Sequence, residues 1–118
     1  MSKNTSLMKS TFGEFIRGLR NDSGLTLTQL AAQLELDSAN LSKIENGKRD
    51  FDEKRLVKLA LVFNLDLKQV KTEFFSDLFA KKMYENDCSM DTLMVAEKKV
   101  FYLKNLNTKQ TEIIFNEE

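Results

Sequence analysis

Apolar positions along residues 26–49 follow the spacing of two short helices. In the first helix they fall at i, i+3, i+4 and i+7, and they are Leu27, Leu30, Ala31 and Leu34. Leu41 and Ile44 give the second helix, predicted over residues 38–46, its apolar side. Residues 34–37 connect the two segments, and this stretch is long enough only for a turn. The pattern therefore predicts a helix-turn-helix motif.

Residues that start and stop helices flank both segments. Thr26 can cap the first helix, with Gln29 at the reciprocal position of a capping box. Asp37 can cap the second helix, and Gly47 can end it in a left-handed conformation. The capping signals and the apolar spacing thus agree on the same two helices.

Helical spacing continues on both sides of this motif. The further predicted helices cover residues 12–23, 52–63, 66–84 and 92–106. The chain has no Pro and only 4 Gly, which favours helices over strands. We therefore expect an all-α protein with a five-helix domain and an additional C-terminal helical segment.

The last two predicted helices carry more apolar side chains than one small domain can cover. Phe75, Phe79 and Met83 widen the stripe of the helix over 66–84, and the helix over 92–106 is apolar on two edges. A second copy of the chain would bury both copies of such a patch at once. The expected dimer interface contains Phe75, Phe79, Leu93, Val100 and Leu103.

Composition narrows the function classes. The 18 Lys and Arg balance the 18 Asp and Glu, and there is no His. We find no metal-ligand cluster, Gly-rich phosphate loop or nucleophile beside a base, so we expect neither an enzyme nor a cofactor or metal. The single Cys88 excludes an internal disulfide and fits a reducing cytoplasm. No apolar run approaches the roughly 18 residues of a membrane span, and no signal peptide is visible.

A specific set of residues surrounds and fills the motif: Leu25-Thr26, Leu30-Ala31, Leu36, Leu41-Ser42-Lys43-Ile44-Glu45-Asn46-Gly47-Lys48-Arg49 and the upstream Gly13, Arg17 and Arg20. These residues give the chain a resemblance to the lambda-repressor-like (Xre-type) DNA-binding family. It extends over residues 12–74 and implies that helix 38–46 enters the major groove while the preceding helix crosses the backbone. Leu27 departs from the family's usual Gln, which helps hold a phosphate. Glu35 departs from a usual Gly with positive φ, at a cost of roughly 1 kcal/mol.

The exposed face of helix 38–46 suits DNA base edges, because Lys can reach guanine acceptors, Asn adenine, and Ala a thymine methyl. A merely solvated polar face is the alternative. The candidate base-reading residues are Ser38, Ala39, Asn40, Ser42 and Lys43. The candidate phosphate contacts are Thr28, Asn46, Lys48, Arg49, Lys54 and Arg55. The resemblance also implies a structural ion pair between Arg20 and Glu45.

These observations predict three parts of the chain: a disordered arm over 1–10, a DNA-binding domain over 11–75, and a C-terminal dimerisation region over 76–118 that ends in a short tail. The arm could instead reach DNA, and the tail could be a docking strand, a partner-binding hook or a frayed end.

The leading hypothesis is a cytoplasmic, homodimeric transcriptional regulator, by default a repressor, on a palindromic site with half-sites about 10 bp apart. Zero net charge predicts weak general affinity for DNA. The alternative is an antitoxin or other protein-interaction module whose C-terminal region binds a different protein.

Overall fold

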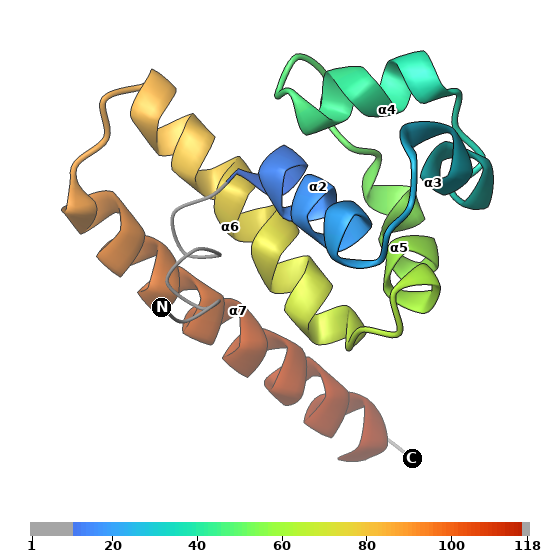
Figure 1. Ribbon diagram of the computed structural model, residues 1–118. Coiled ribbons are helices and arrows are strands. Elements are labelled where there is room, and N and C mark those ends of the chain that lie inside the picture. The colour runs from blue at the N-terminus through green and yellow to red at the C-terminus, as the bar shows by residue number, and fades with distance from the viewer. Residues whose placement is uncertain (1–10, 117–118) are drawn as a thin grey trace. The chain divides into compact units, whose positions relative to one another are not determined.

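The computed structural model describes residues 11–116, with side chains through residue 108 (Figure 1). Its elements are α2 (Phe12–Asp22), α3 (Leu27–Gln33), α4 (Ser38–Glu45), a 3₁₀ turn η1 (Glu53–Arg55), α5 (Leu56–Val62), α6 (Leu67–Glu85) and α7 (Met90–Asn116). The described residues contain no strand, which confirms the all-α prediction. The chain divides into two compact units between Ala80 and Lys81. The predicted arm over 1–10 lies outside the described residues.

Side-chain caps fix where the first helices begin. The Oγ1 atom of Thr11 accepts a hydrogen bond from the amide of Glu14 at 3.2 Å, and Glu14 Oε1 accepts from the amide of Thr11 at 2.9 Å. The bond from the Thr11 amide, together with one that the Thr11 hydroxyl donates to Oε1 at 3.1 Å, lowers the pKa of the Glu14 carboxyl below its ordinary value. Thr26 and Gln29 form the same capping box at the start of α3, as predicted.

Left-handed residues end several helices. Gly47 has φ 75° after α4, as predicted, and Asn64 has φ 52° after α5 and ends that helix in the same way. Glu35, between α3 and α4, has φ 59° although it carries a side chain. The turn therefore has the positive φ at the position where the family that this sequence resembles usually has Gly. In a residue with a side chain this conformation carries a strain of roughly 1 kcal/mol.

A single apolar core holds the first unit together. Its largest fully buried side chains come from α2, α3, the α3–α4 turn, α4, α5 and α6, and they are Ile16, Leu30, Leu34, Leu41, Leu59 and Val70. The Phe12 ring lies 5.5 Å from the Phe51 ring and 5.2 Å from the Phe74 ring, centroid to centroid. Each such side chain stabilises the fold by roughly 1.5–3 kcal/mol relative to an exposed position. The core thus joins the helix-turn-helix motif to α2 and α6.

The second unit is dominated by α7, and here the predicted helix over 92–106 was too short. From the sequence, Asp91 was expected to cap this helix. The helix instead begins at Met90, which puts Asp91 in its first turn, and it continues to Asn116. Asn105 and Asn107 cost only about 0.7 kcal/mol each in a helix, and no Gly or Pro follows them to stop it. The segment predicted as a short tail is therefore helical through residue 116.

Aromatic and aliphatic side chains of this second unit face solvent in the described chain. Tyr84, in the last turn of α6, is 88% exposed, and Tyr102, on α7, is 63% exposed. Among the helices that the structure describes, none combines the length and the apolar character that crossing a bilayer requires.

Candidate nucleic-acid interface

The two helices of the motif pack directly on each other at one side of the first unit (Figure 1). Ala31 is buried where α3 meets α4, together with Leu34 and Leu41. The amide of Leu36 donates to the carbonyl of Ala31 at 2.8 Å and closes the turn. A larger side chain at Ala31 would separate the helices, so the crossing depends on this small residue.

The outer face of α4 carries the candidate base-reading residues. Leu41, Ile44 and Glu45 are buried and define the inner side of the helix. Ser38, Ala39 and Lys43 are exposed, while Asn40 and Ser42 are half-buried. At 100° per residue, Ala39 and Lys43 lie nearly opposite the buried side. The structure thus presents a small apolar group and a cation, separated by one helical turn, to solvent.

Two arginines of α2 converge on Glu45, the last residue of α4. Arg20 Nε lies 2.7 Å from Glu45 Oε2, and Arg20 Nη2 donates to Oε1 at 3.0 Å. Arg17 Nε lies 3.4 Å from Oε1, and Arg17 Nη2 donates to the Glu45 carbonyl at 3.1 Å. The bond to Glu45 raises the pKa of Arg20 above its ordinary value. The buried carboxylate is therefore held by two cations, of which the resemblance identified one.

Asn46, a candidate phosphate contact, is engaged within the protein. Its Oδ1 atom accepts from Arg17 Nη2 at 2.5 Å, and its Nδ2 atom donates to the Ser42 carbonyl at 2.8 Å. A phosphate contact through this side chain would have to replace one of these bonds. Thr28, Lys48 and Lys54, three other candidates, are exposed.

Arg55 links α5 to the turn of the motif. Its Nε donates to the Leu34 carbonyl at 3.0 Å, its Nη2 to the Glu35 carbonyl at 3.3 Å, and its Nη1 to Asp52 Oδ2 at 3.1 Å. Lys58 of α5 forms an ion pair with the Glu35 carboxylate. Sequence reasoning missed this role, because it joins residues about 20 positions apart. A phosphate contact by Arg55 remains a prediction and would use its other N–H groups.

Asn40 joins two charged residues. Its Nδ2 atom donates to Asp37 Oδ2 at 3.0 Å, and its Oδ1 atom accepts from Arg49 Nη1 at 2.9 Å. Asp37 also caps α4, because its Oδ1 accepts from the Asn40 amide at 2.7 Å. A polar chain therefore runs from the helix start to the loop that follows the helix.

The residues expected in a dimer interface fall into two groups. On α6, the Phe75 ring stands edge-on to Phe74 at 5.0 Å, and the Phe79 ring, 55% exposed, lies 6.1 Å from Phe75. On α7, Leu93, Val100 and Leu103 are exposed. Each group forms an apolar stripe on its own helix, and their role in an interface remains a prediction.

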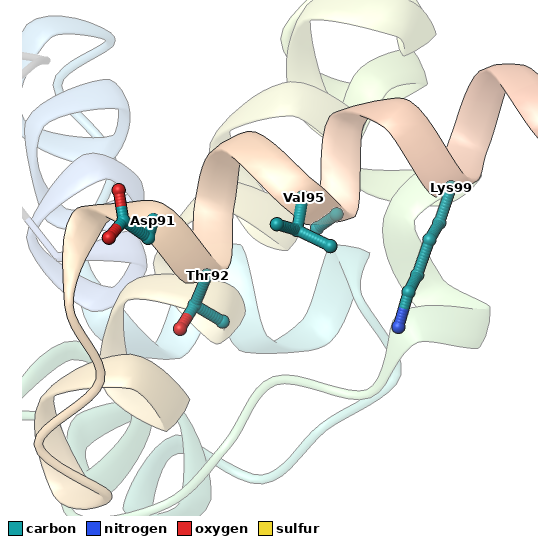
Figure 2. Close-up of a pocket in the computed structure, with 5 residues that line it drawn as sticks. Asp91, Thr92, Val95 and Lys99 are labelled. Carbon is teal, nitrogen blue, oxygen red and sulfur yellow. The ribbon is translucent and has the colours of Figure 1, made fainter.

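A hollow runs along the first turns of α7. Figure 2 shows Asp91, Thr92, Val95 and Lys99, which line it together with Ala96. All of these lining residues belong to one helix, so among the described residues nothing encloses a small ligand here. No cluster of three metal-ligating side chains occurs in this part of the chain either.

The chain is similar to known proteins over the elements that build this interface. Residues 13–74 match the family described as a helix-turn-helix domain. The HTH-type transcriptional repressor RghR of Bacillus subtilis (strain 168) is 30% identical over 106 residues, which cover 86% of this chain and 76% of that protein. The uncharacterized HTH-type transcriptional regulator RghRB of the same organism is 52% identical over 40 residues, covering 34% of this chain and 29% of that protein.

Among solved structures, the restriction-modification controller protein C.AhdI from Aeromonas hydrophila is similar with a TM-score of 0.46. It is 29% identical and covers 56% of this chain and 97% of its own. The family match runs from the second residue of α2 into α6 and so includes both helices of the motif.

Proposed function

The chain belongs to the helix-turn-helix domain family of DNA-binding transcriptional regulators, and we propose that it represses transcription as a homodimer on a palindromic operator. Its relatives are regulators and not enzymes, as the lack of a catalytic motif in the sequence predicts. The observation that carries the proposal is the outer face of α4, where Ser38, Ala39 and Lys43 are exposed on a helix anchored by Glu45.

In this proposal α4 lies in the major groove and reads base edges. Lys43 donates to guanine acceptors, and the Ala39 methyl contacts a thymine methyl. Phosphates flanking the groove are contacted by Thr28, Lys48 and Lys54, while α3 crosses the backbone. Because cations and anions balance over the whole chain, specific contacts supply a larger share of affinity than in a strongly basic protein.

The proposed dimer uses the apolar residues of α6 and α7. A homodimer with a two-fold axis matches the symmetry of a palindromic site, with half-sites about 10 bp apart or a multiple of that. Exposed Leu93, Val100 and Leu103 supply apolar area that a second copy would bury. Occlusion of the operator is the simplest route to repression. Because a transcriptional regulator has to reach its operator DNA, we propose that the protein acts in the cytoplasm.

Selection of bound duplexes from a random pool tests this function. The expected result is an enriched inverted repeat, and the spacing of its halves gives the distance between the two recognition helices. Enrichment of no sequence above background would contradict the proposal. A single enriched half-site, without a repeat, would retain the base readout and contradict the dimer.

Sedimentation of full-length variants tests the interface. Leu93→Lys with Val100→Lys should convert the dimer to a monomer, because it places charges in the apolar stripe. Lys98→Glu is the matched control, since residue 98 lies on the opposite side of α7 from Val100 at 100° per residue. A double variant that still sediments as a clean dimer would move the interface off α7.

An alternative function for the same region rests on the extent of its apolar surface. Phe101 and Tyr102 are about as exposed as Leu103 but lie on other sides of α7, so a single two-fold stripe leaves them uncovered. This arrangement favours an additional protein partner, as in an antitoxin. A purified chain that is soluble only with such a partner would support this alternative over a regulator that acts as a homodimer alone.

A further inference from the structure

The side chain of Asn40 has both of its polar atoms occupied. Its oxygen accepts from Arg49 at 2.9 Å, and its amide nitrogen donates to Asp37 at 3.0 Å. An asparagine that reads adenine needs the same two atoms for a bidentate contact with N6 and N7. Both bonds would have to break first, and each involves a charged partner, which makes it stronger than a neutral hydrogen bond. Base reading by Asn40 is therefore costly.

The position of Asn40 on α4 also separates it from Ala39 and Lys43, which are proposed to read bases. The buried Leu41 and Ile44 define the inner side of the helix, and at 100° per residue Asn40 lies on a flank, about a quarter turn away from it. Ala39 and Lys43 lie farther out. In a helix that fills the major groove, the outermost residues meet the base edges, whereas the flanks face the sugar-phosphate walls.

The chain after α4 brings Arg49 back to this flank. Gly47, at φ 75°, reverses the backbone, and the amide of Lys48 donates to the Lys43 carbonyl at 2.8 Å. Arg49 is exposed, yet its guanidinium contacts a residue nine positions earlier in the chain. An untethered arginine loses side-chain entropy when it binds, and a tether removes part of that loss beforehand.

We propose that Asn40 is a positioning residue, which holds the Arg49 guanidinium at the flank of α4 so that it clamps a backbone phosphate beside the groove. This inference rests on the proposed DNA-binding function. It replaces base reading by Asn40 and gives Arg49 a fixed approach direction. Asp37 contributes to this positioning, because its carboxylate orients the Asn40 amide so that the amide oxygen faces Arg49.

A double-mutant cycle on DNA binding tests the inference. Affinities of Asn40→Ala, Arg49→Ala and the double variant are measured on the selected operator and on a scrambled duplex, at several salt concentrations. Arg49→Ala should weaken binding to both duplexes by about 3- to 10-fold and lower the salt slope by about 1. Asn40→Ala should also weaken binding to both duplexes and should leave the base preference unchanged. The double variant should bind no more weakly than Arg49→Ala.

Lys48→Ala is the matched control, because it removes a neighbouring cation for which no bond to Asn40 is present. Its effect should add to that of Asn40→Ala. Additive effects of Asn40→Ala and Arg49→Ala would overturn the positioning role, and so would a relaxed preference at one base position in Asn40→Ala. If the unaltered protein bound neither duplex, the DNA-binding function itself would fail, which is a different outcome from binding with additive changes.

Discussion

Gly13 of α2 lies directly against the carbonyl of Ile44 in α4. A methyl group added at Gly13 would overlap the Ile44 oxygen and stand 2.9 Å from the Glu45 oxygen. Both obstacles are backbone atoms, which cannot rotate away. The close approach of the two helices thus depends on the absence of a side chain at this residue.

Gly13→Ala should therefore destabilise the fold by about 1–3 kcal/mol, because α2 must move away from α4. Urea unfolding measures the loss. Gly18→Ala on the same helix is the control, since a Cβ there meets nothing within 4 Å. That control should stabilise the protein by about 0.5–1 kcal/mol through helix propensity. Equal effects at the two positions would contradict the close packing of α2 on α4.

Glu45→Ala should cost about 3–5 kcal/mol, because it leaves the mostly buried Arg20 without its carboxylate. Arg17→Ala should cost less than about 1 kcal/mol, since the Arg17 side chain is 38% exposed and its ion pair is screened by water. The double change of Arg20 and Glu45 to leucine should cost less than the sum of the single changes. Thermal melts with additive, small losses would show that the pair contributes little.

Glu35→Gly should stabilise the protein by roughly 0.5–1 kcal/mol, because it relieves the positive φ. It removes the Lys58 partner as well, but the Glu35 side chain is 70% exposed, so that ion pair contributes little. Glu35→Ala removes the same ion pair and keeps the strain, and it should be neutral or slightly destabilising. A higher denaturant midpoint for Glu35→Gly than for Glu35→Ala would support the strain, and the reverse order would contradict it.

Lys43→Ala should cost about 1–3 kcal/mol on the preferred operator and relax the preference at one position per half-site. Lys54→Ala should weaken all sequences alike and lower the salt dependence, as expected for a phosphate contact. Competition between operator variants distinguishes the two behaviours. An unchanged base preference in Lys43→Ala would mean that α4 does not read bases through this residue.

The stability of α2 should depend on pH through Glu14. The bonds from Thr11 lower its pKa below the ordinary 4.5, so the folded state releases this proton more readily than the unfolded chain. The contribution of Glu14 to folding stability is therefore present above pH 4.5. It is lost as the pH falls through the lower pKa that Glu14 has in the folded state. In thermal melts at a series of pH values, Glu14→Gln should lose less stability on acidification than the unaltered protein. An unchanged dependence of stability on pH would contradict the role of Glu14.

Glu73 on α6 provides a control of opposite sign. Burial and the nearby Asp77 raise its pKa above the ordinary value. The contribution of Glu73 to folding stability is complete below pH 4.5. It is lost as the pH rises through the pKa that Glu73 has in the folded state. Glu73→Gln should therefore stabilise the protein at neutral pH, whereas Glu14→Gln should not.

Local features of this fold could be predicted from the sequence, because they depend on neighbours in the chain. The capping boxes at Thr11 and Thr26 and the left-handed Gly47 and Asn64 are of this kind. The roles of Arg17 and Arg55 could not, since their partners lie 28 and 21 residues away and only the packed core brings them together. The end of α7 was also missed, because no residue type there forces a helix to stop.

The two exposed tyrosines have a practical meaning for spectroscopy. The chain has 2 Tyr and no Trp, and Tyr84 and Tyr102 both lie after Ala80. Near-ultraviolet fluorescence of the unlabelled protein therefore originates in the second unit, while the motif is optically silent above the Phe absorption. Quenching or a spectral shift of this emission would follow changes around Tyr84 and Tyr102, so self-association that covers these rings would be detected. One intrinsic signal thus reports on the second unit without any engineered probe.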